Sequence, residues 1–365
     1  MNIFNIISNT PINPLAIPST ELTHNTMGRL DTTRPVILVD TSYWLYYRFF
    51  ALRAWYKKAF PDPTRAPNFD MEHNWLDDAV FMPKFRKLFI DNIKTLVRKY
   101  KTIMTNVVFC LDCSYKDIWR NALTTEYKAT RPESLKKKGF NSFNVFAYMK
   151  KDYLPELQVQ YGVKILYNPR CEADDVIGHM APFLVGRGVS SVYIIANDND
   201  YMQICNSRIK MIKGNLAAVG SSIGGGASAS ASASASSDNE GCNGERYLIR
   251  KILLGDVSDN IRPCSVNKLL LEKSFQNLKD INTGLEARVY KTVNKTNVEI
   301  LLKDGEGYAF FSQLLEGIRN GDIKDGKDPQ LELIHYFYEN AVLMDFKMIP
   351  RDLQRELEGR FSSYL

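Results

Sequence analysis

Nine acidic residues stand in five groups along the chain, and most groups come directly after an apolar, strand-like run. They are Asp40, Asp112, Glu172, Asp174, Asp175, Asp198, Asp200, Asp256 and Asp259. Carboxylates are hard oxygen ligands that suit Mg²⁺ or Mn²⁺. One cation accepts only a few of them, so a cluster this rich would repel itself unless two ions neutralised it. The acidic residues therefore predict a two-ion site, and such sites mostly act on phosphoesters.

Basic residues are concentrated in one stretch of the chain. Between Cys113 and Lys151, nine basic residues stand against three acidic ones, a local excess of +6. The formal charge of the whole chain, also +6, is modest and says little about partners. A metal site that cuts an anionic substrate needs a positive surface beside it, and this stretch is the candidate.

The elements that must position these residues follow an alternating pattern. Apolar runs predict buried strands at residues 36–40, 106–112, 163–167, 191–196 and, more weakly, 208–212. Helices are predicted from Phe85 to Val97 and from Glu172 to about Val185. This alternation predicts an α/β fold with a mainly parallel sheet and helices on both faces. Open sheets of this kind place their sites at the carboxyl ends of the strands. By this rule one edge of the sheet should carry Asp40, Asp112, Asp198 and Asp200.

Composition divides the chain into four segments. Residues 1–34, rich in Asn, Thr, Ser and Pro, are predicted to be a flexible leader before a core at 35–214. Residues 215–246 contain a Gly, Ala and Ser run that cannot bury enough apolar surface to fold, which predicts a disordered insertion. The sequence pattern of residues 247–365 predicts a helical C-terminal part.

The cysteines and the distribution of apolar residues indicate which cellular compartment to expect. Six scattered cysteines do not form a disulfide framework, which favours a reducing, intracellular compartment. The chain shows neither a basic start followed by an apolar stretch nor about 18 consecutive apolar residues, so export and membrane spanning are not expected. The choice between a nucleus and a cytoplasmic viral replication compartment stays open, as does the oligomeric state.

Five short motifs carry a resemblance to a known family. They are Val39-Asp40, Leu111-Asp112, Glu172-Ala-Asp-Asp175, Asn197-Asp-Asn-Asp200 and Gly255-Asp-Val-Ser-Asp-Asn-Ile261. In this order and spacing they resemble the flap endonuclease and 5′-to-3′ exonuclease family, a branch of the PIN-like nucleases, over roughly residues 35–275. The resemblance implies a three-layer sandwich with a helical arch over the metals.

The resemblance also implies roles for the acidic residues. It assigns a first metal mainly to Asp40, Asp112, Glu172 and Asp174. It assigns a second metal to Asp198, Asp200 and Asp256. Asp175 and Asp259 would be outer or water-mediated ligands. Each acid alone has a plainer explanation, since acids also form turns and favour helix N-termini.

The basic stretch, residues 113–151, is similar to the arch of that family. By this resemblance Arg120 and Lys128 reach the scissile phosphate and offset charge in the transition state. The remaining DNA-binding candidates are Tyr127, Arg131, Lys136, Lys137, Lys138 and Lys268. Phosphate contacts are blind to base sequence, so binding should be salt-sensitive and structure-selective. A solvated basic loop is the alternative.

One motif departs from the family pattern. After Asp-Asn-Ile the family normally continues with a glycine-rich helix-hairpin-helix that grips duplex phosphates through backbone amides. Here residues 262–268 read Arg-Pro-Cys-Ser-Val-Asn-Lys and contain no glycine, although close approach to a phosphate favours glycine. The sequence therefore predicts a degenerate hairpin near 256–275, of a kind found in viral branches of the family.

Together these features predict a structure-selective 5′ nuclease that uses two Mg²⁺ ions, with Mn²⁺ as a substitute. The substrate would be DNA with 5′ flaps, 5′ ends or branched junctions, in replication, repair or recombination. Replication or repair proteins would be its partners. Two alternatives remain open. One is a PIN-type endoribonuclease, and the other is a non-catalytic protein that binds DNA junctions.

Overall fold

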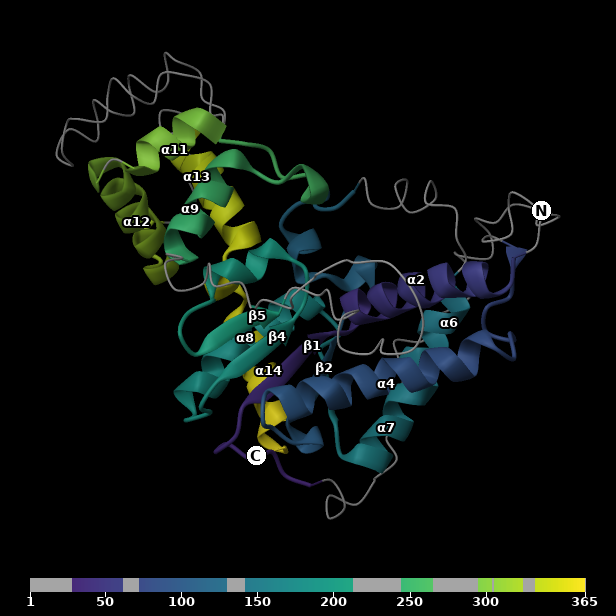
Figure 1. Ribbon diagram of the computed structural model, residues 1–365. Helices are drawn as coiled ribbons and strands as arrows, with labels where there is room; N and C mark the ends of the chain where they lie inside the picture. The colour runs from purple at the N-terminus through teal and green to yellow at the C-terminus, as the bar shows by residue number, and fades with distance from the viewer. Residues whose placement is uncertain are drawn as a thin grey trace.

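The structure, a computed structural model, describes residues 28–61, 72–129, 142–212, 244–264, 295–303, 305–323 and 332–364. Its centre is a five-stranded sheet in the order β3-β2-β1-β4-β5, with every neighbouring pair parallel (Figure 1). The strands are β1 (Val36–Asp40), β2 (Val107–Leu111), β3 (Lys164–Tyr167), β4 (Val192–Ile195) and β5 (Ile209–Ile212). Because all five run in one direction, their carboxyl ends meet at one edge of the sheet.

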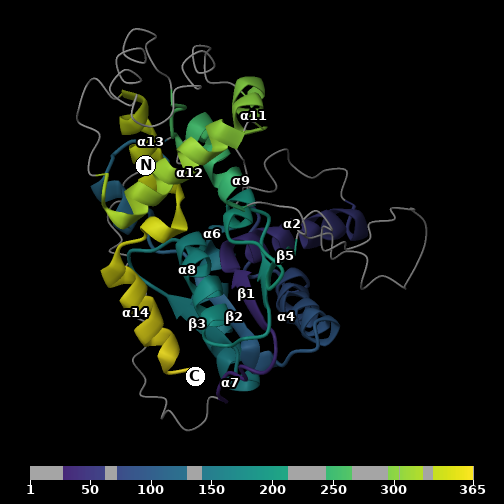
Figure 2. The same cartoon turned by 90° about the vertical axis from the view of Figure 1, so that its left-hand side faces the viewer.

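Helices cover both faces of this sheet (Figure 2). One face carries α2 (Thr41–Ala59), α4 (Phe81–Lys99), α6 (Phe143–Tyr148) and α7 (Leu154–Tyr161), with a π-helical turn at Met149–Tyr153 between the last two. The other face carries α8 (Ala173–Gly186) and α14 (Arg351–Ser362). Residues alternate along β1, so that Ile37 and Val39 pack toward α2 and α4 while Val36 and Leu38 pack toward α8.

A second group of helices lies beyond the carboxyl-end edge of the sheet (Figure 1). It consists of α9 (Gly244–Leu254), α11 (Lys295–Lys303), α12 (Gly305–Asn320) and α13 (Glu332–Met344). These helices share an apolar core of their own, which includes Ile249, Phe311 and Phe337. Short helical turns complete the described chain at Met104–Asn106, Tyr115–Asp117, Trp119–Ala122, Asn199–Gln203, Val257–Asp259 and Phe346–Met348.

After α13 the chain returns to the sheet and packs against α8. The side chain of Phe346 lies so close to Gly178 on α8 that a Cβ there would stand 2.4 Å from its ring. Leu353 and Leu357 of α14 are fully buried in the same core as α8. The outer cover of α8 therefore comes from a segment far along the chain.

The predicted α/β class, parallel sheet, two covering layers and helical C-terminal part are confirmed. The four-segment division stays a prediction, because residues 1–27, 130–141, 213–243 and 265–294 lie outside the described ranges. Described residues lie beside two of the predicted boundaries. Leu30, in the predicted leader, is buried and its N–H donates to Tyr364 O at 2.8 Å, and α9 begins at Gly244, inside the predicted insertion.

Across the described ranges, each helix is either too short or too polar to cross a lipid bilayer.

Candidate metal centre

Three acidic residues are placed by the ends of strands. Asp40 ends β1 and caps α2, where its Oδ1 accepts the Tyr43 N–H at 2.9 Å. Asp112 follows β2, and its Oδ1 accepts the Ala173 N–H at 2.9 Å. Asp198 follows β4 and caps the Asn199–Gln203 turn. Because β1 lies between β2 and β4 in the sheet, these carboxylates are brought to the same edge, as the sequence predicts.

A second set of carboxylates stands at the N-terminus of α8. Glu172 caps this helix, and its N–H donates to Asp175 Oδ2 at 3.1 Å. Glu172, Asp174 and Asp175 each offer an oxygen within 4.8 Å of the others. The charge of Asp174 also raises the pKa of Asp40 and of Asp198, after the larger effect of burial, so this set lies beside the strand ends. The helix N-terminus favours negative charge at this place.

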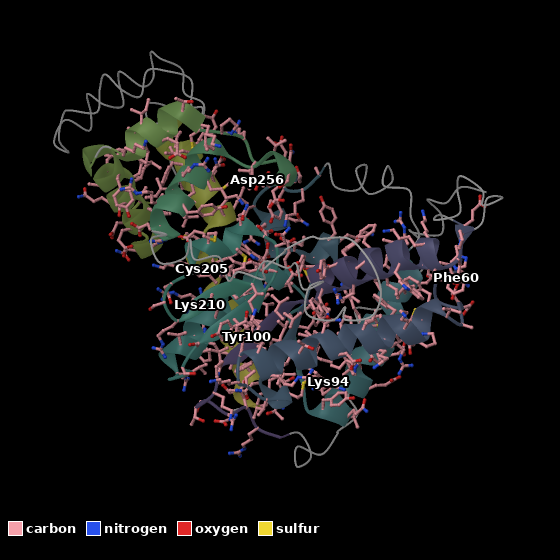
Figure 3. The ribbon with its side chains drawn as sticks, viewed as in Figure 1. Phe60, Lys94, Tyr100, Cys205, Lys210 and Asp256 are labelled. Carbon is pink, nitrogen blue, oxygen red and sulfur yellow. The ribbon has the colours of Figure 1, made fainter. Side chains whose placement is uncertain are left out.

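A third set combines the end of β4 with the loop after α9. Asp200, Asp256 and Asp259 offer oxygens within 4.8 Å of one another. Lys251, on α9, contacts the carboxylate of Asp200 and lies 2.8 Å from Asp256 Oδ2. Asp256 lies between the helical group and the sheet, whereas Phe60 lies at the far end of α2 (Figure 3).

The carboxylates shift one another's pKa values because they lie close together and are partly buried. Burial, followed by the charge of Asp112, raises the pKa of Asp40 to about 7. Burial, followed by the charge of Asp174, also raises the pKa of Glu172 to about 7. For Asp200, burial raises the pKa to about 6 although Lys251 opposes it. Burial acts the same way on Asp256, but hydrogen bonds from Lys251 and Ser258 outweigh it and hold that pKa below its usual value.

The donor set fits divalent cations. Every group is a carboxylate oxygen, the ligand that Mg²⁺ and Mn²⁺ prefer. The charges that act most strongly on Asp40 are those of Asp112, Asp174 and Asp198, all of which disfavour its ionised form. A bound cation would relieve this repulsion, so the residues present match the predicted metal chemistry.

Arg120 occupies a different place from the one that the sequence predicts. Its side chain is 2% exposed, and its Nη1 donates to Asp175 Oδ2 at 2.8 Å while its Nη2 lies 2.7 Å from Oδ1. Its Nε donates to Leu343 O at 2.7 Å. A guanidinium held on both sides in the core does not extend toward a substrate phosphate. Arg120 instead neutralises the fully buried Asp175, which also accepts from Trp119 Nε1 at 3.0 Å.

Lys128 and Tyr127 face the carboxylates directly. Lys128 Nζ donates to Glu172 Oε1 at 2.6 Å and lies 3.7 Å from Asp259 Oδ2, with its side chain 3% exposed. Tyr127 is buried and its hydroxyl donates to Glu172 Oε2 at 2.9 Å. Tyr127 thus holds Glu172, and its DNA contact stays a prediction. The predicted phosphate contact of Lys128 would require its ammonium to leave Glu172.

Two lysines beside the carboxylates are not singled out by the sequence reasoning. Lys251 bridges Asp200 and Asp256, and the signal for it is its place one helical turn before the Gly255-Asp256 motif. Lys150 Nζ donates to Ser42 Oγ at 3.0 Å and lies 3.9 Å from Asp112 Oδ2. The Ser42 hydroxyl in turn donates to Asp112. Lys150 belongs to the basic stretch, but composition alone does not separate it from its neighbours.

The other predicted DNA-binding residues lie outside the described ranges. They are Arg131, Lys136, Lys137, Lys138 and Lys268. Their roles, and that of the degenerate hairpin, stay predictions.

Comparison with known proteins gives consistent results. Two similar curated proteins are 5'-3' exonucleases of Buchnera aphidicola, from subsp. Acyrthosiphon pisum (strain APS) and subsp. Schizaphis graminum (strain Sg). Each is 26% identical over 292 residues, which is 78% of this chain and 86% of the relative. Similar solved structures include the bacteriophage T5 D15 protein co-crystallised with metal ions, at 13% identity and a TM-score of 0.49. The T5 D15 flap endonuclease in complex with DNA and metal ions gives 13% and 0.48, and in both cases the match covers 91% of this chain and 99% of the other.

The family assignment rests on the N-terminal half. Residues 35–223, more than half of the 365-residue chain, match the family model described as the 5'-3' exonuclease, N-terminal resolvase-like domain. This range contains seven of the nine acidic residues, all except Asp256 and Asp259. The resemblance carried by the acidic motifs is thereby confirmed, and the chain belongs to the 5'-3' exonuclease family of hydrolases.

Proposed function

We propose that the protein is a metal-dependent, structure-selective 5′ nuclease that hydrolyses DNA phosphodiesters at 5′ flaps, 5′ ends or branched junctions. The main support is the convergence of nine carboxylates, from five separate segments of the chain, on the carboxyl-end edge of one parallel sheet. The names of the curated relatives agree with this proposal. The biological setting that we propose is DNA replication, repair or recombination.

Two Mg²⁺ ions, replaceable by Mn²⁺, would be held by this edge. Asp40, Asp112, Glu172 and Asp174 are the proposed ligands of the first ion. Asp198, Asp200 and Asp256 are the proposed ligands of the second. Asp175 and Asp259 would act from outer positions, and for Asp175 its two contacts with Arg120 support this. When bound, the ions would activate water and stabilise charge on the attacking and leaving oxygens.

The protein's own cations would act on the substrate phosphates. Lys128 already presents its ammonium to the carboxylates, 2.6 Å from Glu172 Oε1. Once Glu172 is engaged as a ligand, this ammonium is available to donate to a non-bridging phosphate oxygen, where it offsets developing charge. Arg131, the lysines at 136–138 and Lys268 would hold the DNA backbone without reading its bases.

A cleavage assay with end-labelled oligonucleotides tests the proposal. The substrates are a 5′-flap duplex, a blunt duplex and a single-stranded RNA, each with Mg²⁺ and with EDTA. Mg²⁺-dependent cutting of the flap duplex in preference to RNA is the expected result. Preferential cutting of RNA would favour the endoribonuclease, and tight binding of branched DNA without any cutting would favour a non-catalytic junction binder.

A further inference from the structure

The loop between Asp256 and Ile261 is closed and stiff. Asp256 and Ile261 exchange two backbone hydrogen bonds, each of 2.8 Å. Gly255, just before the loop, has φ of +67°, and a Cβ there would lie 2.5 Å from Ile261 O. Only glycine fits such a position without displacing the backbone. The backbone of this loop therefore holds its side chains in fixed positions.

The side chain of Asn260 extends from this loop to Glu126, which belongs to the basic stretch at residues 113–151. Its Nδ2 donates to Glu126 O at 2.9 Å. Its backbone is left-handed, with φ of 57° and ψ of 37°, which glycine, asparagine and aspartate adopt most readily. Glycine would satisfy the backbone without a side chain, and aspartate would offer no donor to a carbonyl. The hydrogen bond to Glu126 is thus what distinguishes asparagine at this position.

The same loop holds the backbone of Lys128. The Lys128 N–H donates to Asp259 O at 2.9 Å. Lys128 also has a positive φ, 55°, which is uncommon for a lysine and persists where surrounding contacts impose it. On their outer side, Glu126, Tyr127 and Asn260 line a pocket of about 640 Å³. The hydrogen bond from the Lys128 N–H to this loop therefore helps to hold the conformation of a residue that is itself buried.

We propose that Asn260 is a positioning residue that acts through Lys128. It holds the Glu126–Lys128 backbone against the loop, so that the Lys128 ammonium points at the carboxylates. Because Asp256 begins the same closed loop, Asn260 also ties the ligand set around Asp256 to the position of Lys128. This inference rests on the proposed nuclease function, within which Lys128 contacts the substrate phosphate.

A double-mutant cycle on cleavage rate tests this inference. Single-turnover cleavage of the 5′-flap duplex with Mg²⁺ is measured for the wild type, Asn260→Gly, Lys128→Ala and the double variant. We expect Asn260→Gly to slow cleavage roughly tenfold while DNA affinity, measured with EDTA present, changes less than about twofold. In the Lys128→Ala background, Asn260→Gly should change the rate less than about twofold, because its partner is already absent. If the rate losses of the two single variants multiply in the double variant, the inference is overturned.

A second variant and a second readout separate positioning from folding. Asn260→Asp retains the left-handed preference but removes the donor, so it should match Asn260→Gly in rate. Amide hydrogen exchange of the metal-free protein should be faster at Lys128 in both variants. Lys101→Gly is the matched control, because Lys101 also has a positive φ (52°) but lies at the opposite edge of the sheet. It should leave rate and Lys128 exchange unchanged.

The outcomes distinguish this inference from the nuclease proposal. Unchanged exchange at Lys128, or a wild-type cleavage rate in Asn260→Gly and Asn260→Asp, overturns the inference and leaves the nuclease proposal intact. A wild-type protein that cuts no DNA overturns both. Undiminished cleavage by Lys128→Ala removes the role of Lys128 and, with it, the inference alone.

Discussion

The ammonium nitrogen of Lys251 lies 2.8 Å from Oδ2 of Asp256, and the same ammonium contacts Asp200. Lys128 has the corresponding relation to Glu172 and Asp259. Lys251 thus bridges two members of the third set of carboxylates, and Lys128 links the second set to the third. A lysine placed in this way compensates charge that divalent cations would otherwise compensate.

Removal of Lys251 should therefore weaken the metal-free protein more than the metal-loaded one. Lys251→Met leaves Asp200 and Asp256 facing each other without their cation, and we expect a loss of about 1–3 kcal/mol in the free energy of unfolding with EDTA. Urea unfolding with EDTA and with Mg²⁺ measures this, and Mg²⁺ should recover most of the loss. Lys87→Met, which breaks an exposed pair with Asp91, should change the free energy of unfolding much less than Lys251→Met does in EDTA, and equally in both conditions. Equal losses for both variants would contradict the prediction.

The stability of the metal-free protein should fall as pH rises from about 4 to about 7. The folded state raises the pKa of Asp40 and Glu172 to about 7, from ordinary values of 3.8 and 4.5. In that window the folded protein binds more protons than the unfolded chain, so rising pH favours unfolding. Thermal unfolding in EDTA across this range measures the slope.

Asp40→Asn isolates the contribution of one carboxylate. Asparagine still offers an acceptor for the Tyr43 N–H, so the cap of α2 is retained. At pH 8 in EDTA we expect this variant to be more stable than the wild type by on the order of 1–2 kcal/mol, and inactive. Asp91→Asn on the surface of α4 is the control. A variant that is less stable than the wild type at pH 8 would show that Asp40 is not under electrostatic strain.

Asp112→Ala and Asp198→Asn should each abolish cleavage while leaving DNA binding largely intact. Both carboxylates lie at the carboxyl-end edge of the sheet and are proposed metal ligands, not proposed DNA contacts. We expect the cleavage rate to fall at least about 100-fold, equivalent to about 2.7 kcal/mol in the activation free energy. Single-turnover rates and gel-shift affinities for the flap duplex check the two statements separately. Cleavage at the wild-type rate by either variant would refute the proposed ligand set.

Substitution of Arg120 should mainly reduce stability, whereas substitution of Lys128 should mainly reduce the cleavage rate. Arg120→Ala leaves the fully buried Asp175 without its partner, which should cost about 3–5 kcal/mol of stability. Arg120→Lys should not restore it, because a lysine cannot make the two contacts of the guanidinium with Asp175. Lys128→Ala should mainly lower the cleavage rate. Urea unfolding beside single-turnover rates separates the two, and similar stability losses would contradict the assignment.

The fold and the clustering of the acidic residues at one edge of the sheet could be predicted from the sequence because they depend on local patterns. Buried parallel strands require continuous apolar runs, and a metal site at their ends requires acids immediately after them, as at Asp40 and Asp112. The roles of basic residues depend on distant partners instead. Arg120 is buried because it pairs with Asp175 and contacts Leu343 O. The one local sign for Lys251 is its place one helical turn before Gly255-Asp256, and this place alone does not distinguish it from a solvated lysine on an amphipathic helix.

The cover that α14 places on α8 has a consequence for the timing of assembly. Glu172 and Asp175 begin α8, but the helix that buries the outer side of α8 starts only at Arg351. At synthesis rates of roughly 5–20 residues per second, α14 follows the Glu172–Asp175 segment by on the order of 10–35 seconds. A nascent chain therefore exposes the apolar side of α8 throughout this interval. We expect the carboxylate centre to be complete only after α14 has been synthesised and has packed against α8.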